Sequence, residues 1–514
     1  MSAHPSRNRR RILNTFARAA GVAAAVGLGN DPARAEEASI QIANQLEAYY
    51  DSELEESVMD DRLDATLSYG PYSLGTVFLS HSPSGPLRVD PNDFGEKRQG
   101  LWRRWIGAET EGWSVKAGHV YSTFGRGLGF SVFEDQVVDF YPALDGFLGE
   151  AEFGIASIKA VAGTADYTQT VVSAPAYVDP FAVRAFEVGL KLPRNLALGL
   201  ETALTDGNGE AAEENPVYDR IAGGHLGTSL GGRADLYGEY VVRDANYRDG
   251  DEGPAQGHAG YASATFYLGR VQVLSEFKDL LRYDVPFVNA PTVVRQHTST
   301  LLNRGGHTPN IQKNDERGGL VEALVTVNEA TRVVGSFSRS EARHAYTPAR
   351  EVYGEIERWL TERAELIVRA AETEEVVLEG GDEIFFERIT YGGNLLLPLD
   401  ESYSLDLGFE TQGTQEQNRA TRDFRKPVEF RDTLISATLS RAPNMSFAVT
   451  TEWTDSPKET DDFWLWGEWN LRVGSRHQLL LGGGRLRGGQ LCSGGVCKLV
   501  DPFEGGRIEF LTTF

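Results

Sequence analysis

Residues 403–410 read Tyr403-Ser404-Leu405-Asp406-Leu407-Gly408-Phe409-Glu410, with apolar side chains at the odd positions and polar or small residues at the even positions. A β-strand points successive side chains to opposite faces, so this alternation predicts a strand with one apolar and one polar face. The polar face would carry Asp406 and Glu410. The same two-residue period recurs in 61–69 and 386–397, where Arg388 belongs to the polar set.

Segments of this kind fill the chain, and the connections between them are alternately short and long. We count about 24 of them (22–24), each near the 9 to 11 residues that a transmembrane strand needs. The short connections are rich in Gly, Pro and Asn, as hairpin turns require. The pattern predicts an all-β transmembrane antiparallel up-and-down β-barrel with both termini on the short-turn, periplasmic side. The longest connections are 81–100, 122–146, 163–180, 282–317 and 488–502.

Composition supports one barrel over 36–514 without a linker. The 514 residues include 56 Gly, mean hydropathy is −0.33, and the net charge of −24 argues against a nucleic-acid partner. The strand count is open at 147–162, where the chain forms either a hairpin around Gly154 or one long strand.

The N-terminus carries the features of a secretory signal. Basic residues at Arg9-Arg10-Arg11 precede an Ala-rich apolar stretch and the small-residue site Ala33-Arg34-Ala35. We therefore expect a signal peptide over 1–35, read either by the general secretion route or by the twin-arginine route. A disordered basic tail is the remaining alternative.

The C-terminal segment 507–514 ends in a terminal Phe, with apolar residues at alternate positions before it: Phe514, Phe510 and Ile508. Together with the signal peptide and the strand rhythm, this resembles the porin-like Gram-negative outer-membrane β-barrel proteins. The resemblance implies location in the bacterial outer membrane, and Phe510 and Phe514 as the signal that the barrel-assembly machinery reads. Outer-membrane lipid and lipopolysaccharide would be its surroundings.

The long connection 122–146 is too apolar for a loop in water. In porins, the third outer loop folds inward and narrows the channel, and the position here corresponds. We therefore expect 122–146 to form a constriction in which Arg126 opposes Glu134, Asp135, Asp139 and Asp145. The alternative is that the segment plugs or braces the barrel. Further lumen charges are expected at Arg388, Asp406, Glu410, Glu468 and Arg472.

Sites of other kinds have little support in the sequence. Cys492 and Cys497 flank a Gly-Gly turn, and a small disulfide ring between them is expected in an exported chain. Two thiols do not complete a metal shell, and we expect no metal site, no cofactor and no catalytic residues. The protein is not expected to be an enzyme.

The predicted barrel is compatible with two functions. The first is a porin-like channel for passive diffusion of small hydrophilic solutes, with a mild cation preference from its acid-rich lumen. The alternative is a non-conducting barrel that serves as a surface scaffold, an adhesin or a partner of an envelope or secretion complex. An energy-coupled receptor is not expected, because strands begin within a few residues of the presumed cleavage site and leave no room for a plug.

Overall fold

The computed structural model describes residues 38–53, 55–82, 99–135, 142–167, 178–206, 216–247, 255–283, 285, 287–304, 315–342, 348–379, 382–418, 427–493, 496–500 and 502–514. The expected signal peptide lies outside these residues.

The elements follow the strand rhythm of the sequence. They are β1 (Ser39–Asp51), β2 (Glu56–Tyr69), β3 (Tyr72–Ser82), β4 (Gln99–Glu109), β5 (Trp113–Val120), β6 (Ser122–Thr123), β7 (Ser131–Val132), β8 (Ala143–Phe153), β9 (Ala156–Tyr167), β10 (Val178–Leu192), β11 (Leu196–Asp206), β12 (Pro216–Ser229), β13 (Ala234–Tyr247), β14 (Ala255–Leu268), β15 (Val271–Leu281), α2 (Thr300–Arg304), β16 (Glu316–Asn328), β17 (Thr331–Ala342), β18 (Ala349–Trp359), β19 (Glu365–Glu379), β20 (Asp382–Pro398), β21 (Tyr403–Asn418), β22 (Val428–Arg441), β23 (Met445–Thr454), β24 (Phe463–Val473), β25 (His477–Leu486), β26 (Gly489–Ser493), β27 (Val496–Val500) and β28 (Phe503–Thr513).

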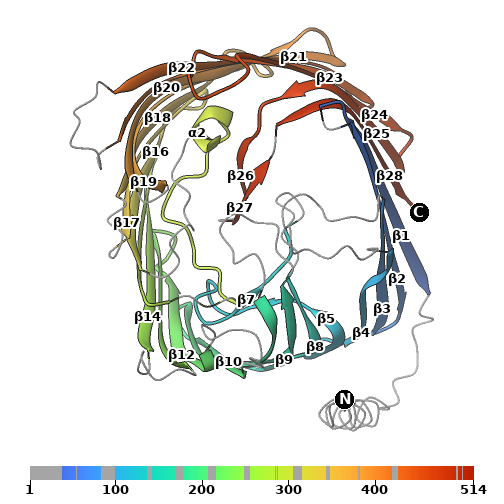
Figure 1. The fold of residues 1–514 in the computed structure, drawn as a ribbon. Coiled ribbons are helices and arrows are strands. Elements are labelled where there is room, and N and C mark those ends of the chain that lie inside the picture. The colour runs from blue at the N-terminus through green and yellow to red at the C-terminus, as the bar shows by residue number, and fades with distance from the viewer. Residues whose placement is uncertain are drawn as a thin grey trace, which may run out of the picture.

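The main sheet is a closed barrel of 24 antiparallel strands. Each strand of the main sheet pairs with the main-sheet strands that come before and after it in the chain. The ring closes where β1 pairs with β28, from Ala43↔Thr513 to Asp51↔Gly505. The predicted fold class is confirmed. Residues 147–162 form a hairpin and not one long strand: Gly154, with a left-handed φ of 61°, lies in the turn between β8 and β9. Figure 1 views the ring along its axis.

The two faces of the wall differ as the alternation predicted. On β21, Leu407 and Phe409 are exposed on the outside, whereas Gly408 between them and Glu410 after them are buried on the lumen side. The same apolar belt faces outward all around the ring. Because the ring is closed, it has no unpaired strand edge. Among the described residues, no helix combines the length and the apolar character needed to cross a membrane.

Elements outside the main sheet come from three of the long connections. The connection 122–146 contains the short β6–β7 pair, 282–317 contains α2, and 488–502 contains the β26–β27 hairpin. Figure 1 draws β7, α2 and β26 within the ring of strands. The sequence pattern predicted these stretches only as connections, because each element is too short to show a period.

An apolar core lies on the lumen side of β8–β16. Phe124, Leu128 and Phe130 pack there with Phe287 and Tyr283, and all five side chains are fully or almost fully buried. The wall contributes mainly small or β-branched residues to this core: Val161, Ala165, Val183, Ala185, Ala203, Ile221, Val241 and Ala259. The larger Leu144, Tyr261, Leu280 and Leu320 also belong to it. The barrel therefore has an internal core built by inserted chain, in addition to its lipid-facing belt.

Candidate functional site in the barrel lumen

Residues 122–135, which with 142–146 are the described parts of the predicted constriction, contact lumen-facing side chains of β10 and β13. The carboxylate of Glu239 accepts hydrogen bonds from the backbone N–H groups of Arg126 (2.6 Å) and Leu128 (2.9 Å). The carboxylate of Glu187 accepts one from the Gly125 N–H at 3.2 Å. Carboxylates of the wall thus satisfy backbone donors of the segment, which are costly to bury without a partner.

A second segment, made of the described residues between 283 and 304 (283, 285 and 287–304), packs on the first. The hydroxyl of Tyr283 donates to the carbonyl oxygen of Leu128 at 2.6 Å, and the N–H of Asn289 donates to the carbonyl of Gly127 at 3.2 Å. Gly127 has a φ of 93°, and a Cβ there would lie 2.8 Å from the Asn289 carbonyl oxygen. Only glycine fits both constraints.

Beyond Asn289 the second segment follows the inner wall to β21. His297 Nε2 lies 2.9 Å from the carboxylate of Glu351, and Arg369 donates to the hydroxyl of Thr298 at 2.8 Å. At the start of α2, Glu410 accepts hydrogen bonds from the Ser299 hydroxyl (2.9 Å) and from the N–H groups of Thr300 (3.2 Å) and Leu301 (2.9 Å). Glu410, predicted as a lumen charge, therefore anchors inserted chain.

This anchoring gives a first prediction. Glu410→Ala leaves three donors of Ser299–Leu301 without their acceptor, and we expect it to lower the free energy of unfolding by about 2–4 kcal/mol. Glu410→Gln keeps an acceptor oxygen and is expected to lose less than half as much. Urea unfolding in lipid vesicles, followed by tryptophan fluorescence, measures both variants. Equal losses in the two variants would show that the acceptor is not what stabilises the segment.

A third segment reaches the same region from the last long connection. Arg487 contacts Asp432 and Glu452 at 2.7 Å each, and Arg304 pairs with the same Glu452. The β26–β27 hairpin follows, and its register places Cys492 directly opposite Cys497. That register suits the predicted disulfide, which stays a prediction.

Two predicted partners of Arg126, Glu134 and Asp145, pair with other residues. Its guanidinium lies over the ring of Tyr237, 5.1 Å from the centroid. Glu134 instead pairs with Arg62 at 3.1 Å and accepts a hydrogen bond from the Tyr121 hydroxyl at 2.7 Å. Asp135 ends the described part of the segment, and Asp139 lies outside the described residues.

Asp145 also differs from its expected position. It belongs to β8, where its neighbour Leu144 is buried in the internal core, so Asp145 points to the outward face. There it pairs with Arg104 at 3.1 Å. Asp145 was predicted to lie in a connection, because the polar and glycine residues before Phe147 do not show the apolar alternation of a strand.

The remaining predicted lumen charges lie on the lumen side of their strands. Arg388 pairs with Glu375 at 2.5 Å and is buried. Asp406 shares the lumen face of β21 with Glu410, and Glu468 and Arg472 share the lumen face of β24 with the buried Trp464.

The lumen wall opposite the internal core carries charges that stay partly exposed. Arg507 of β28 pairs with Glu47 of β1 at 3.0 Å and with Glu509 at 3.2 Å. The side chains of Arg507 and Glu47 are 40% and 29% exposed. Inserted chain therefore buries one part of the wall, while the described side chains on β28 and β1 remain partly exposed.

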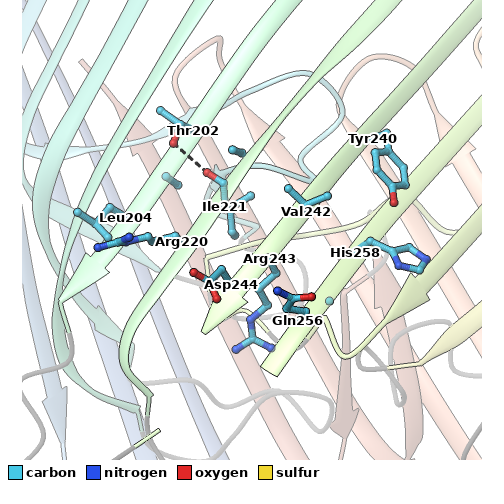
Figure 2. A pocket seen from close by; sticks show the side chains of 13 residues that line it. Thr202, Leu204, Arg220, Ile221, Tyr240, Val242, Arg243, Asp244, Gln256 and His258 are labelled. Carbon is cyan, nitrogen blue, oxygen red and sulfur yellow. Dashed lines mark hydrogen bonds between the residues drawn. The ribbon is translucent and has the colours of Figure 1, made fainter. Parts of the chain in front are cut away.

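A groove of about 740 Å³ lies on β11–β14, outside the lumen. Figure 2 shows its lining residues, of which Arg220, Tyr240 and His258 stand at outward-facing strand positions. The groove is thus a feature of the outer surface of the barrel and does not contribute to a channel.

The carboxyl end of the chain closes the wall. Phe514 exchanges backbone hydrogen bonds with Ile42 of β1, and the ring of Phe510 stacks on His477 of β25 at 5.9 Å. Both phenylalanines face outward, as their alternation predicted. Their role as an assembly signal stays a prediction.

Several solved structures are similar to this chain at low identity. The P pilus usher PapC translocation pore is 10% identical, with 92% of this chain and 99% of that chain covered and a TM-score of 0.47. The siderophore receptor PirA from Pseudomonas aeruginosa is 10% identical over 94% of this chain and 81% of that chain, also with a TM-score of 0.47. The copper transporter OprC is 9% identical over 94% and 82%, with a TM-score of 0.42.

No family model and no curated protein sequence matches the chain. The chain has an even number of antiparallel strands, closed into a ring, with an apolar outer belt and charged side chains on the lumen face of its wall. That combination is the architecture of bacterial outer-membrane proteins. The chain is a 24-stranded outer-membrane β-barrel.

Proposed function

We propose that the barrel is a channel for passive diffusion of small hydrophilic solutes across the outer membrane. One observation carries the proposal: lumen-facing charges on β28, β1 and β2 keep part of their surface in solvent, although they point to the interior of the ring. Charged walls of this kind bind water and hydrated ions and repel apolar molecules. The inserted segments narrow the passage from the opposite side.

The proposed passage prefers cations. Along its wall, Glu47, Glu509 and Asp64 accompany Arg507 and Arg62, so acidic side chains outnumber basic ones in this group. The chain as a whole has a formal charge of −24. An acid-rich lumen raises the local concentration of cations and therefore their share of the current.

Single-channel recording in planar bilayers tests the proposal. The purified full-length chain is expected to give discrete current steps and, in asymmetric KCl, a reversal potential of the sign for cation selectivity. Glu509→Gln is expected to move the reversal potential toward zero, because it removes a negative charge from the wall of the passage. Asp279→Asn is the matched control, since Asp279 lies on the outward face beside His258 and contributes nothing to the lumen.

A second function is favoured by the internal core. Phe124, Phe130 and Phe287 are fully buried inside the barrel, which is the packing expected of a closed interior. A barrel that stays silent in bilayers would overturn the channel proposal. It would leave the non-conducting reading, in which the barrel is a surface scaffold or a partner of an envelope complex.

A further inference from the structure

Three potential metal ligands meet on the lumen face of β10, β11 and β12. Glu187 and Glu201 are register partners in the β10–β11 ladder, and His225 follows on the next strand. One ligand atom from each of the three residues lies within 4.8 Å of the other two. The cluster therefore arises from cross-strand register and not from a local sequence motif.

Glu201 lacks the partners that a buried carboxylate needs. Its residue is 4% exposed, and among the described residues neither of its side-chain oxygens accepts a hydrogen bond. Nδ1 of His225 is likewise buried without a partner. Directly opposed carboxylates repel each other, and an uncompensated buried charge costs several kcal/mol. A proton or a metal cation bound between these groups would remove that cost.

The neighbouring carboxylate of Glu239, unlike that of Glu201, has several hydrogen-bond donors. Glu239, the register partner of His225, accepts hydrogen bonds from two N–H groups of the inserted segment and from the Tyr237 hydroxyl at 2.5 Å. Glu201 receives none of these donors. The inserted segment nevertheless passes close to Glu201: a Cβ on Gly129 would lie 2.5 Å from the Glu201 carboxyl carbon.

The wall also makes room for the imidazole. Gly199 of β11 is the register partner of His225, and a Cβ at Gly199 would lie 2.0 Å from the ring carbon Cε1. Any other residue at Gly199 would push the ring away from the carboxylates. The absence of a side chain at Gly199 thus leaves room for the His225 ring beside the two carboxylates.

We propose that Glu187, Glu201 and His225 bind one divalent transition-metal cation of the zinc or manganese class. Two carboxylate oxygens and one imidazole nitrogen are ligands that such cations take. Bonds of about 2.1 Å put opposed ligands at most about 4.2 Å apart, a separation that small side-chain movements can reach from atoms already within 4.8 Å of one another. The bound cation would neutralise the opposed carboxylates and join three strands beneath the inserted segment.

Metal titration of the refolded full-length chain tests this proposal. The protein, stripped with chelator and freed of any affinity tag, is titrated with Zn²⁺ against a fluorescent indicator, and Co²⁺ absorption bands report protein ligands directly. We expect one tight site per chain. Glu201→Gln is expected to weaken Zn²⁺ binding by about 10- to 100-fold or more, since even losses beyond the ligand shell have effects of that size.

His225→Ala supplies a second variant with intact carboxylates, so that a folding defect in one variant does not decide the matter. Glu355→Gln, a lumen carboxylate on β18 that accepts from the Tyr353 hydroxyl, is the control and is expected to bind Zn²⁺ as the unmodified chain does. Equal binding by all four proteins, or no binding by the unmodified chain, would overturn the site. The latter result would point to a shared proton in place of a metal. None of these readouts depends on conduction, so the metal site and the channel can fail separately.

Discussion

Replacing Phe124–Phe130 with an Asn-Gly turn is expected to raise the single-channel conductance by about twofold or more, since a pore conducts according to its narrowest cross-section. The replacement is possible because Thr123 and Ser131 are register partners in the β6–β7 pair, with their hydroxyl oxygens 3.1 Å apart. A two-residue turn spans such a gap. The two short strands therefore stay connected while the inserted chain between them is lost.

The same replacement is expected to increase cation selectivity. The segment covers Glu187 and Glu239 with its N–H groups, and removing it exposes both carboxylates to the lumen. The reversal potential in asymmetric KCl measures this change in the same recordings. Heat-modifiable mobility on gels establishes that the variant barrel has folded.

Asn-Gly in place of Gly231-Gly232 is the control for this experiment. Both glycines have left-handed φ values, 59° and 70°, in the turn between β12 and β13, and Asn-Gly suits such a turn. The control carries the same dipeptide at a site away from the inserted segment, and its conductance is expected to equal that of the unmodified chain. An unchanged conductance in the replacement variant as well would rule out the constriction.

The wall of the barrel could be predicted from sequence because its determinants are local. Alternation such as that of Leu407 and Phe409 against Glu410 assigns faces without knowledge of any distant residue. The turn at Gly154 likewise depends on the conformational freedom of one residue. A two-residue period and turn chemistry together therefore predict the strands, their order and their orientation.

The interior could be predicted only in part, because its contacts join residues far apart in the chain. The apolar character of 122–146 indicated burial, but its charge partners come from other strands: Arg62 reaches Glu134 across 72 positions. The second inserted segment was missed, although Val285, Phe287 and Val288 are apolar within the longest connection. The cluster at Glu201 has no sequence signature, since cross-strand register brings its members together.

Removal of Arg243 is expected to cause a large loss of stability. Its guanidinium donates to both oxygens of Asp219 at 2.7 to 3.0 Å, and both side chains are almost fully buried. A third donor of Arg243 reaches the carbonyl of Arg282 at 2.9 Å, at the point where the second inserted segment leaves β15. The pair thus links two strands of the wall to the start of the inserted chain.

Arg243→Leu is expected to lower the free energy of unfolding by about 3–5 kcal/mol, because it removes the bidentate partner of a buried carboxylate. The double variant Arg243→Leu/Asp219→Leu removes both charges and is expected to recover most of that loss. Urea unfolding in lipid vesicles measures both variants. Lys191→Leu, which breaks an exposed pair with Glu152, is the control and is expected to cost about 1 kcal/mol or less. A cost for Arg243→Leu as small as that of the control would mean that the buried pair does not hold the inserted chain to the wall.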